Sequence, residues 1–142
     1  MEPVTQVLSE HDRRITMTPA PETLEPVMDF VAQALEDWGV GMKRANQIEL
    51  ACDELYSNII NYSGAAVAAV ALSKQDTGIA VTFEDNGIAY DPTAKEDPDV
   101  TAAPEDREIG GLGIFLVKNF ASFLGYRREE EKNILTVTFD NL

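Results

Sequence analysis

Length, composition and charge limit the kind of protein that this chain can be. It has 142 residues, 44% hydrophobic and 25% charged, which is typical of one globular domain with a real core. The net charge of −14 argues against nucleic acid and anionic membranes as partners, and it favours a partner with a basic surface. No apolar run approaches the length of a membrane span, and the N-terminus does not resemble a signal peptide. With one cysteine (Cys52) and one histidine (His11), we expect no disulfide, no Cys/His metal site and a cytoplasmic location.

The first forty residues predict two strands and a helix. A short edge strand is expected over Val4–Leu8, and Arg13–Thr18 alternates polar with apolar residues as a strand does. Two prolines end that second strand. Thr23 is the expected N-cap of a helix over Leu24–Trp38, whose apolar residues recur on one face.

A helix over Ala45–Tyr62 is the centre of the predicted structure. Apolar residues recur at three- and four-residue steps, which indicates one buried face: Ile48, Ala51, Cys52, Leu55, Ile59 and Tyr62. Beside this face, Glu54 and Asn58 are one turn apart and can point into one small volume. A carboxylate next to a neutral carbonyl oxygen could serve a proton and a hard cation such as Mg²⁺. The ordinary alternative is that both side chains are simply solvated.

The second half of the chain predicts two hairpins, separated by an acidic loop and a helix. Strands are expected over Ala66–Ser73, Ile79–Glu84, Tyr126–Glu130 and Ile134–Phe139, with the second turn at 131–133. The loop Asp91–Glu108 contains three prolines and seven acidic residues, and loops of this length are usually functional lids or disordered. An apolar helix is expected over 113–124, with Gly125 ending it.

This order of elements predicts an α+β fold in one domain, residues 1–142. Because two strand pairs are hairpins, the sheet is expected to be mixed but mostly antiparallel. The helices 24–38, 45–62 and 113–124 each carry one apolar stripe, so all three should pack on one face of the sheet. The predicted architecture is a two-layer sandwich.

Two more motifs combine polar or glycine residues with the ends of elements. Asp85 ends a strand, and a buried carboxylate there needs a donor such as the exocyclic amine of a purine. Gly87 would let the backbone turn or approach a ring closely, although Asp-Asn-Gly is also a common turn sequence. Gly110, Gly111 and Gly113 open a helix, where free backbone N–H groups form an anion site. A loose hinge is the alternative for these glycines.

In order and spacing, the three motifs together resemble the GHKL, or Bergerat, ATP-binding domain. ELACDELYSNIINY is similar to the N box of that family, VTFEDNGIAYDP to its G1 box and REIGGLGIFLVKNF to its G2 box. The resemblance is greatest to small anti-sigma-factor serine/threonine kinases, and it runs from about Ile15 to Phe139. Many family members have Gly-Thr before the last strand. This chain has Asn133-Ile134-Leu135-Thr136 there, so no threonine is assigned to the adenine pocket.

The resemblance implies roles around a nucleotide for the first two motifs. Glu54 would be the general base or would orient the attacking hydroxyl group, and Asn58 would bind Mg²⁺ through its side-chain oxygen. Asp85 would accept a hydrogen bond from the adenine amino group, with Gly87 beside the ring.

For the third motif the resemblance implies phosphate binding. The backbone amides of Gly110, Gly111 and Gly113 would face the phosphates of ATP. Arg107 would contact the γ-phosphate, with a solvated loop arginine as the alternative. Residues of about 91–109 would form the lid over the nucleotide.

The implied function is an ATP-dependent kinase of a regulatory pathway. It would bind a sigma factor, phosphorylate a serine on a small anti-sigma-factor antagonist and form a homodimer. The alternative is a catalytically weak, nucleotide-gated protein-binding module that uses ATP to order its lid. A histidine kinase or topoisomerase-like ATPase is not expected, because we see no room for a phospho-acceptor helical domain and His11 lies near the terminus.

Overall fold

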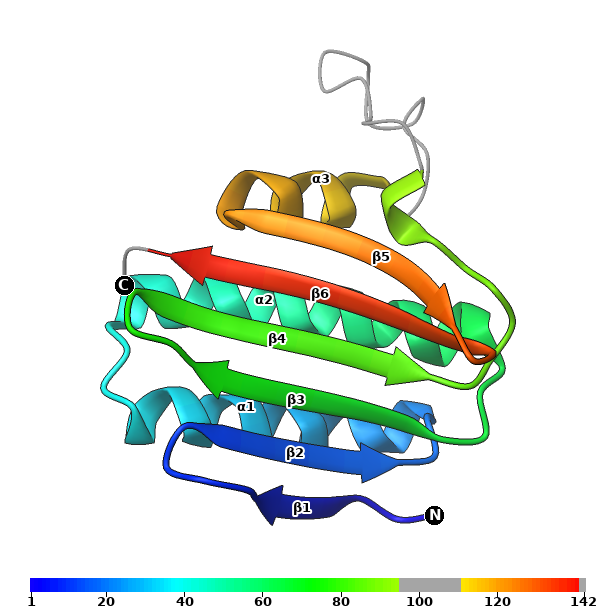
Figure 1. Ribbon diagram of the computed structural model, residues 1–142, viewed down its shortest axis with the longest axis horizontal. Helices are drawn as coiled ribbons and strands as arrows, with labels where there is room; N and C mark the ends of the chain where they lie inside the picture. The colour runs from blue at the N-terminus through cyan, green and yellow to red at the C-terminus, as the bar shows by residue number, and fades with distance from the viewer. Residues whose placement is uncertain (95–110, 141–142) are drawn as a thin grey trace.

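The computed structural model describes residues 1–94 and 111–140, and its fold is built on one six-stranded sheet (Figure 1). The strands are β1 Val4–Val7, β2 Asp12–Met17, β3 Ala68–Lys74, β4 Gly78–Asp85, β5 Phe123–Glu129 and β6 Lys132–Asp140. Their order in the sheet is β1-β2-β3-β4-β6-β5. Every pairing between the described strands is antiparallel, so the parallel pair that a mixed sheet needs does not occur among them.

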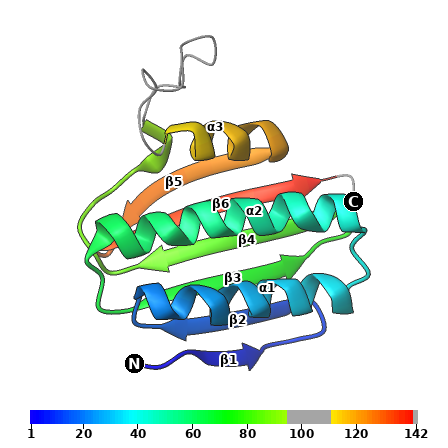
Figure 2. The ribbon, with the colours of Figure 1, turned by 180° about the vertical axis from the view of Figure 1, so that it is seen from behind.

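Three helices cover one face of this sheet, as Figure 2 shows from behind. They are α1 Leu24–Asp37, α2 Met42–Asn58 and α3 Gly111–Phe120. The central helix α2 packs against both α1 and α3. The predicted α+β two-layer sandwich is therefore confirmed. None of the described helices is both long and apolar enough to cross a membrane.

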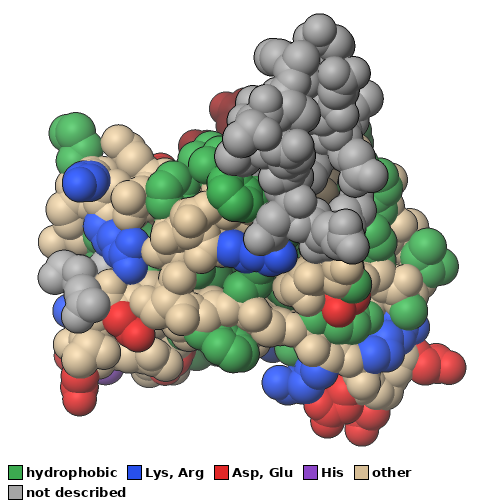
Figure 3. Space-filling view, turned by 90° about the horizontal axis from the view of Figure 1, so that it is seen from above, with side chains coloured by type: hydrophobic (Ala, Val, Ile, Leu, Met, Phe, Trp, Pro, Cys, Tyr) green, Lys and Arg blue, Asp and Glu red, His purple; other side chains and the backbone are tan. Residues whose placement is uncertain are grey.

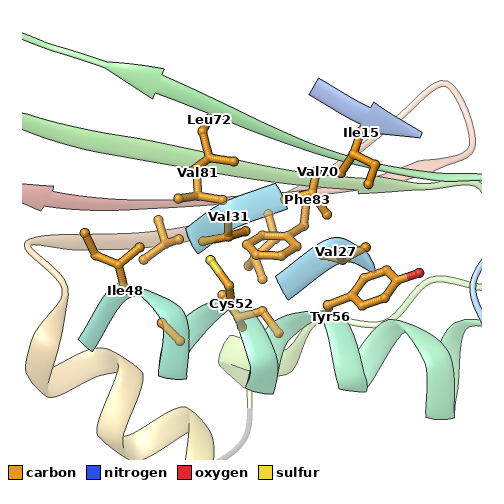
Figure 4. Packing of buried hydrophobic residues seen from close by; sticks show 14 of the residues in the cluster. Ile15, Val27, Val31, Ile48, Cys52, Tyr56, Val70, Leu72, Val81 and Phe83 are labelled. Atoms are coloured by element: carbon orange, nitrogen blue, oxygen red, sulfur yellow. The ribbon is translucent and has the colours of Figure 1, made fainter. Parts of the chain in front are cut away.

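The core lies between the sheet and the helices. Along β4 and β6, every second side chain is buried, which is the pattern of a sheet with one covered face. Figure 4 shows Val31 of α1 and Cys52 of α2 beside Val81 and Phe83 of β4. All four side chains are at most 1% exposed. Burial of a Val or Phe side chain stabilises the fold by about 1.5–3 kcal/mol.

Helix α1 starts at Leu24 with Thr23 at the N-cap position, as predicted, but the Thr23 side chain makes no capping hydrogen bond. Thr23 ends a short 3-10 helix, Pro21–Thr23, and donates its hydroxyl proton to the carbonyl oxygen of Ala20 at 2.7 Å. The hydroxyl group of Tyr56 is therefore the donor in the buried 2.6 Å bond to Thr23. This bond joins the entry of α1 to α2, and burial raises the pKa of Tyr56.

The central helix begins earlier than predicted and changes its winding before it ends. It starts at Met42, and the stretch Ile59–Ser63 is a π-helix closed by Gly64 at φ +62°. A π-turn holds more residues than an α-turn, so it rotates the side chains that follow. Tyr62, predicted on the buried face, is consequently 44% exposed.

The third helix ends four residues before its predicted end. It stops at Phe120, and β5 begins at Phe123. Leu124, predicted on the helix, pairs with Val137 of β6. The apolar residues around 124 fit either element, and pairing with the open edge of β6 decides in favour of the strand.

The last hairpin turns at Glu130 and Glu131, earlier than the predicted turn at 131–133. Both residues have positive φ, 50° and 63°, as the two-residue turns of tight hairpins require. Asn133, predicted in the turn, lies in β6 directly opposite Asp85 of β4. This difference matters because it places a polar side chain on the covered face of the sheet.

Candidate functional site

A pocket opens at the edge of the core where β4 ends and β6 begins. The space between its walls, including the part open to solvent, is about 340 Å³. Its lining comes from both layers: Leu55, Asn58, Ile59, Ser63, Phe83, Asp85, Tyr90, Pro92, Tyr126, Asn133 and Leu135. Apolar walls with a few convergent polar groups are typical of small-molecule sites.

Asp85 is the carboxylate of this pocket. It is the last residue of β4 and only 4% exposed. Its Oδ1 atom accepts a hydrogen bond from the backbone N–H of Gly87 at 2.9 Å and from Nδ2 of Asn133 at 3.0 Å. No hydrogen bond from the described residues reaches Oδ2. A nearly buried carboxylate with one acceptor atom available fits a ligand that brings its own N–H donor.

Gly87 is required by its contact with the end of the π-helix that follows α2. A methyl group at this position would overlap the backbone carbonyl group of Ser63. The same carbonyl oxygen accepts a hydrogen bond from the backbone N–H of Ile88 at 2.9 Å. The loop after Asp85 is thus seated on the π-helix, and this contact by itself explains the glycine. The predicted place of Gly87 beside a bound ring stays a prediction.

Asn58 and Glu54 lie on α2 one turn apart, as predicted, and they face different neighbours. Asn58 is the last residue of α2 and lines the pocket. The carboxylate of Glu54 lies against Gly113, in the first turn of α3. The structure therefore brings three predicted site residues, Glu54, Asn58 and Gly113, to the junction of α2 with α3, beside the pocket that holds Asp85.

Other predicted residues of the phosphate site are only partly described. Gly111 is the first residue of α3. Arg107 and Gly110 lie outside the described residues, and so does the predicted lid of about 91–109 apart from its first residues. Of these, Pro92–Ala94 form a 3-10 helix, and Pro92 lines the pocket.

Two aromatic side chains close together mark the mouth of the site. Tyr62 of the π-helix stacks on Tyr90, with ring centroids 5.3 Å apart and an interplanar angle of 27°. Tyr90 also lines the pocket. The stack therefore joins the end of the central helix to the loop that forms one wall of the site.

Sequence reasoning missed Tyr90 and Asn133 as site residues. For Asn133 a signal was available: Leu135, Val137 and Phe139 alternate inward, and the same period carried back by two residues places Asn133 inward as well. The predicted turn at 131–133 placed Asn133 outside the strand, so this period was not extended to it. For Tyr90 we find no signal in the sequence, because its place depends on the π-turn that exposes Tyr62.

The oxygen ligands that the pocket offers are compatible with Mg²⁺ bound together with a nucleotide. The described residues contain no group of three or more His, Cys, Asp or Glu side chains that could hold a metal by themselves. Mg²⁺ usually keeps several waters and takes one or two protein ligands plus substrate phosphates. Asn58, which offers a neutral oxygen at the pocket, fits that arrangement.

The charges of the described surface are mixed near this end of the molecule. Figure 3 looks onto the side of α3 and β5, where Lys and Arg side chains lie apart from one another and several Asp and Glu side chains gather at one corner. The described residues thus form no continuous basic surface in this view. An anionic ligand would have to be bound by local groups such as helix N-termini.

Known proteins share both the sequence pattern and the fold. A family model described as the histidine kinase-like ATPase domain matches residues 17–139. Serine/threonine-protein kinase BtrW of Bordetella bronchiseptica is 33% identical over 95 residues, which cover 64% of this chain and 67% of BtrW. The histidine kinase domain of a blue-light activated histidine kinase from Erythrobacter litoralis EL346 has the same fold. Its TM-score is 0.51 at 20% identity, over 86% of this chain and 61% of that chain.

These similarities agree with the geometry of the pocket. The match to the family model runs from the last residue of β2 into β6, and it includes Glu54, Asn58 and Asp85. The predicted resemblance to GHKL-type domains is confirmed, and with it an ATP-binding, kinase-like function. The chain belongs to the family of histidine kinase-like ATPase domains.

Proposed function

We propose that this protein is an ATP-dependent protein serine/threonine kinase that acts on a partner protein. The observation that carries the proposal is the position of Glu54. Its carboxylate lies against Gly113 in the first turn of α3, and Glu54 is one helical turn along α2 from Asn58 at the pocket. Similarity to a relative named a serine/threonine-protein kinase supports the class of acceptor.

The adenine ring would occupy the pocket and the phosphates would extend toward α3. Asp85 would accept from the 6-amino group of adenine, between walls that include Phe83 and Leu135. The triphosphate would extend to the start of α3, where Gly111 and Gly113 carry no side chain of their own and the Glu54 carboxylate lies against Gly113. Asn58 would hold Mg²⁺, which supplies charge neutralisation to the phosphates when bound.

Glu54 would act on the acceptor hydroxyl group. Phosphoryl transfer depends mainly on positioning and charge stabilisation, and a carboxylate near the γ-phosphate can accept or orient the serine proton. The Glu54 carboxylate lies against Gly113 at the start of α3 in the protein without ligand. A group held in place before the substrate arrives loses little freedom in the reaction.

The partners in this proposal are a sigma factor and a small antagonist of the anti-sigma factor, and the cellular location is the cytoplasm. The protein's net charge of −14 favours partners with basic surfaces. Phosphorylation would add about −1.5 to −2 charges to the antagonist beside an acidic kinase, which favours its release. The active form would be a homodimer.

The experiment is phosphate transfer from γ-labelled ATP in an extract of the native cells, with the purified protein added. We expect a labelled small protein whose label survives acid and is removed by alkali, as phosphoserine is. Acid-labile label, typical of phosphohistidine, would contradict the proposal. His11→Ala is the control for self-labelling, because His11 is the chain's one histidine. ATP binding without any transfer would leave the nucleotide-gated binding module as the function.

A further inference from the structure

Asn133 lies at the centre of a hydrogen-bond network inside the pocket. It is the second residue of β6, pairs with Asp85 across the sheet and is 4% exposed. Its Nδ2 group donates to Oδ1 of Asp85 at 3.0 Å and to the carbonyl oxygen of Ile88 at 2.7 Å. Both hydrogens of the amide are therefore used.

The other end of the same amide accepts three hydrogen bonds. Oδ1 of Asn133 lies 2.6 Å from the hydroxyl group of Tyr126, 3.1 Å from Nη1 of Arg128 and 3.2 Å from the backbone N–H of Tyr90. The orientation of the amide follows from these partners. A flipped amide would aim its N–H groups at a backbone N–H and a guanidinium, and its oxygen at a carboxylate and a carbonyl.

This network determines which oxygen of Asp85 is left for a ligand. Both hydrogen bonds to Asp85 end on Oδ1, from Gly87 on one side and Asn133 on the other. Two donors on one oxygen prevent the carboxylate from rotating about its terminal bond. Oδ2 is then the atom that meets the ligand, and a carboxylate oxygen can only accept.

We propose that Asn133 is a positioning residue that makes the pocket select a 6-amino purine over a 6-oxo purine. The inference rests on the proposed ATP site and deepens it. An amino group at position 6 can donate to Oδ2 of Asp85, whereas a carbonyl oxygen at that position would face it with no proton between them. Tyr126 and Arg128 hold Asn133 in place through hydrogen bonds to its Oδ1 atom.

The ratio of the affinities for a 6-amino and a 6-oxo purine nucleotide measures this role of Asn133 separately from its effect on protein stability. Binding of ATP and of inosine triphosphate, each with Mg²⁺, is measured by calorimetry for the wild-type protein and for Asn133→Ala. The wild-type protein should prefer ATP by at least roughly tenfold, the change expected for one well-made hydrogen bond. In Asn133→Ala this ratio should fall by about the same factor, because Asp85 is free to turn. A general loss of structure would weaken both nucleotides equally.

Two further variants provide a second change at Asn133 and a matched control. Asn133→Asp keeps the shape of the side chain but places an acceptor opposite Asp85, so the ratio of ATP to inosine triphosphate affinity should fall in this variant too. It provides the test if Asn133→Ala does not fold. Asn119→Ala, a matched change at an exposed asparagine of α3, should keep the wild-type ratio. A folded Asn133 variant with the wild-type ratio would overturn the inference and leave the ATP site intact. A wild-type protein that binds neither nucleotide would overturn the proposed ATP site itself.

Discussion

The carboxylate of Glu54 lies so close to the α carbon of Gly113 that a methyl group on residue 113 would overlap it. Glu54 belongs to α2 and Gly113 to the first turn of α3, so the contact joins two motifs that are 59 residues apart in the sequence. The φ angle of Gly113 is not positive, so the effect of a side chain at this position is to displace the Glu54 carboxylate and not to strain the backbone. A carboxylate at the start of a helix is also favoured by the helix dipole.

This contact predicts the effect of Gly113→Ala. In an ordinary helix position the change would stabilise by roughly 1 kcal/mol, because alanine is the better helix former. Here the added methyl group must displace the Glu54 carboxylate or α3, and phosphate transfer should fall at least about tenfold. The measurement is the rate of transfer from labelled ATP. Gly41→Ala is the matched control, because a methyl group at Gly41 meets no atom within 4 Å. Wild-type activity in Gly113→Ala would show that the contact has no role.

The stack of Tyr62 on Tyr90 should couple the π-helix to the pocket loop. Aromatic pairs of this geometry contribute about 0.5–1.5 kcal/mol beyond the area that they bury. A double-mutant cycle with Tyr62→Ala and Tyr90→Ala, read by urea unfolding, should give a coupling energy in that range. Tyr62→Phe keeps the ring and should keep the coupling. Additive single changes would mean that the two rings do not support each other.

Cys52 should be unreactive in the folded protein. It is fully buried on α2, and burial raises the pKa of its thiol, so the reactive thiolate is absent at neutral pH. A thiol reagent such as DTNB should release almost no signal from the native protein and one equivalent per chain in urea, since the chain has one cysteine. Rapid stoichiometric reaction without denaturant would contradict the packing of α2 against the sheet.

Asn58→Ala should weaken binding of ATP with Mg²⁺ much more than binding of ATP with EDTA. The change removes the side-chain oxygen assigned to the metal and leaves Asp85 and the walls of the pocket in place. Calorimetry in the two buffers measures both affinities. Asn61→Ala is the control, because Asn61 is exposed on the π-helix and does not line the pocket. Equal losses in both buffers would remove Asn58 from the metal site.

Much of the fold was predictable because hydrophobic periodicity is a local property. The alternation in β6 and the apolar stripe of α2 each appear in the sequence, and both elements exist as the pattern predicts, although α2 begins earlier and becomes a π-helix after Asn58. The end of α3 was not predictable in the same way. Leu124 fits a helix by its spacing, and only pairing with Val137 from another segment puts it in a strand.

The position of a candidate site residue in the fold was predictable where that residue stays on a regular element. Glu54, Asn58 and Asp85 lie on α2 and β4, whose periods fix the direction of each side chain. The positions of Asn133 and Tyr90 depend instead on turns and loops between the regular elements. The first needs the early turn at 130–131, and the second needs the loop that follows Asp85 to meet the π-helix.

In the proposed reaction, Glu54 takes part in phosphate transfer to a protein hydroxyl group. This role is tested by comparing wild type, Glu54→Gln and the exposed-residue control Glu36→Gln in transfer from γ-labelled ATP to serine in the native extract. Glutamine keeps the size and reach of Glu54 but cannot accept the proton. We predict that Glu54→Gln transfers roughly 10²–10⁴-fold more slowly while its ATP affinity changes little, and that Glu36→Gln equals wild type. Transfer by Glu54→Gln at the wild-type rate would contradict the account.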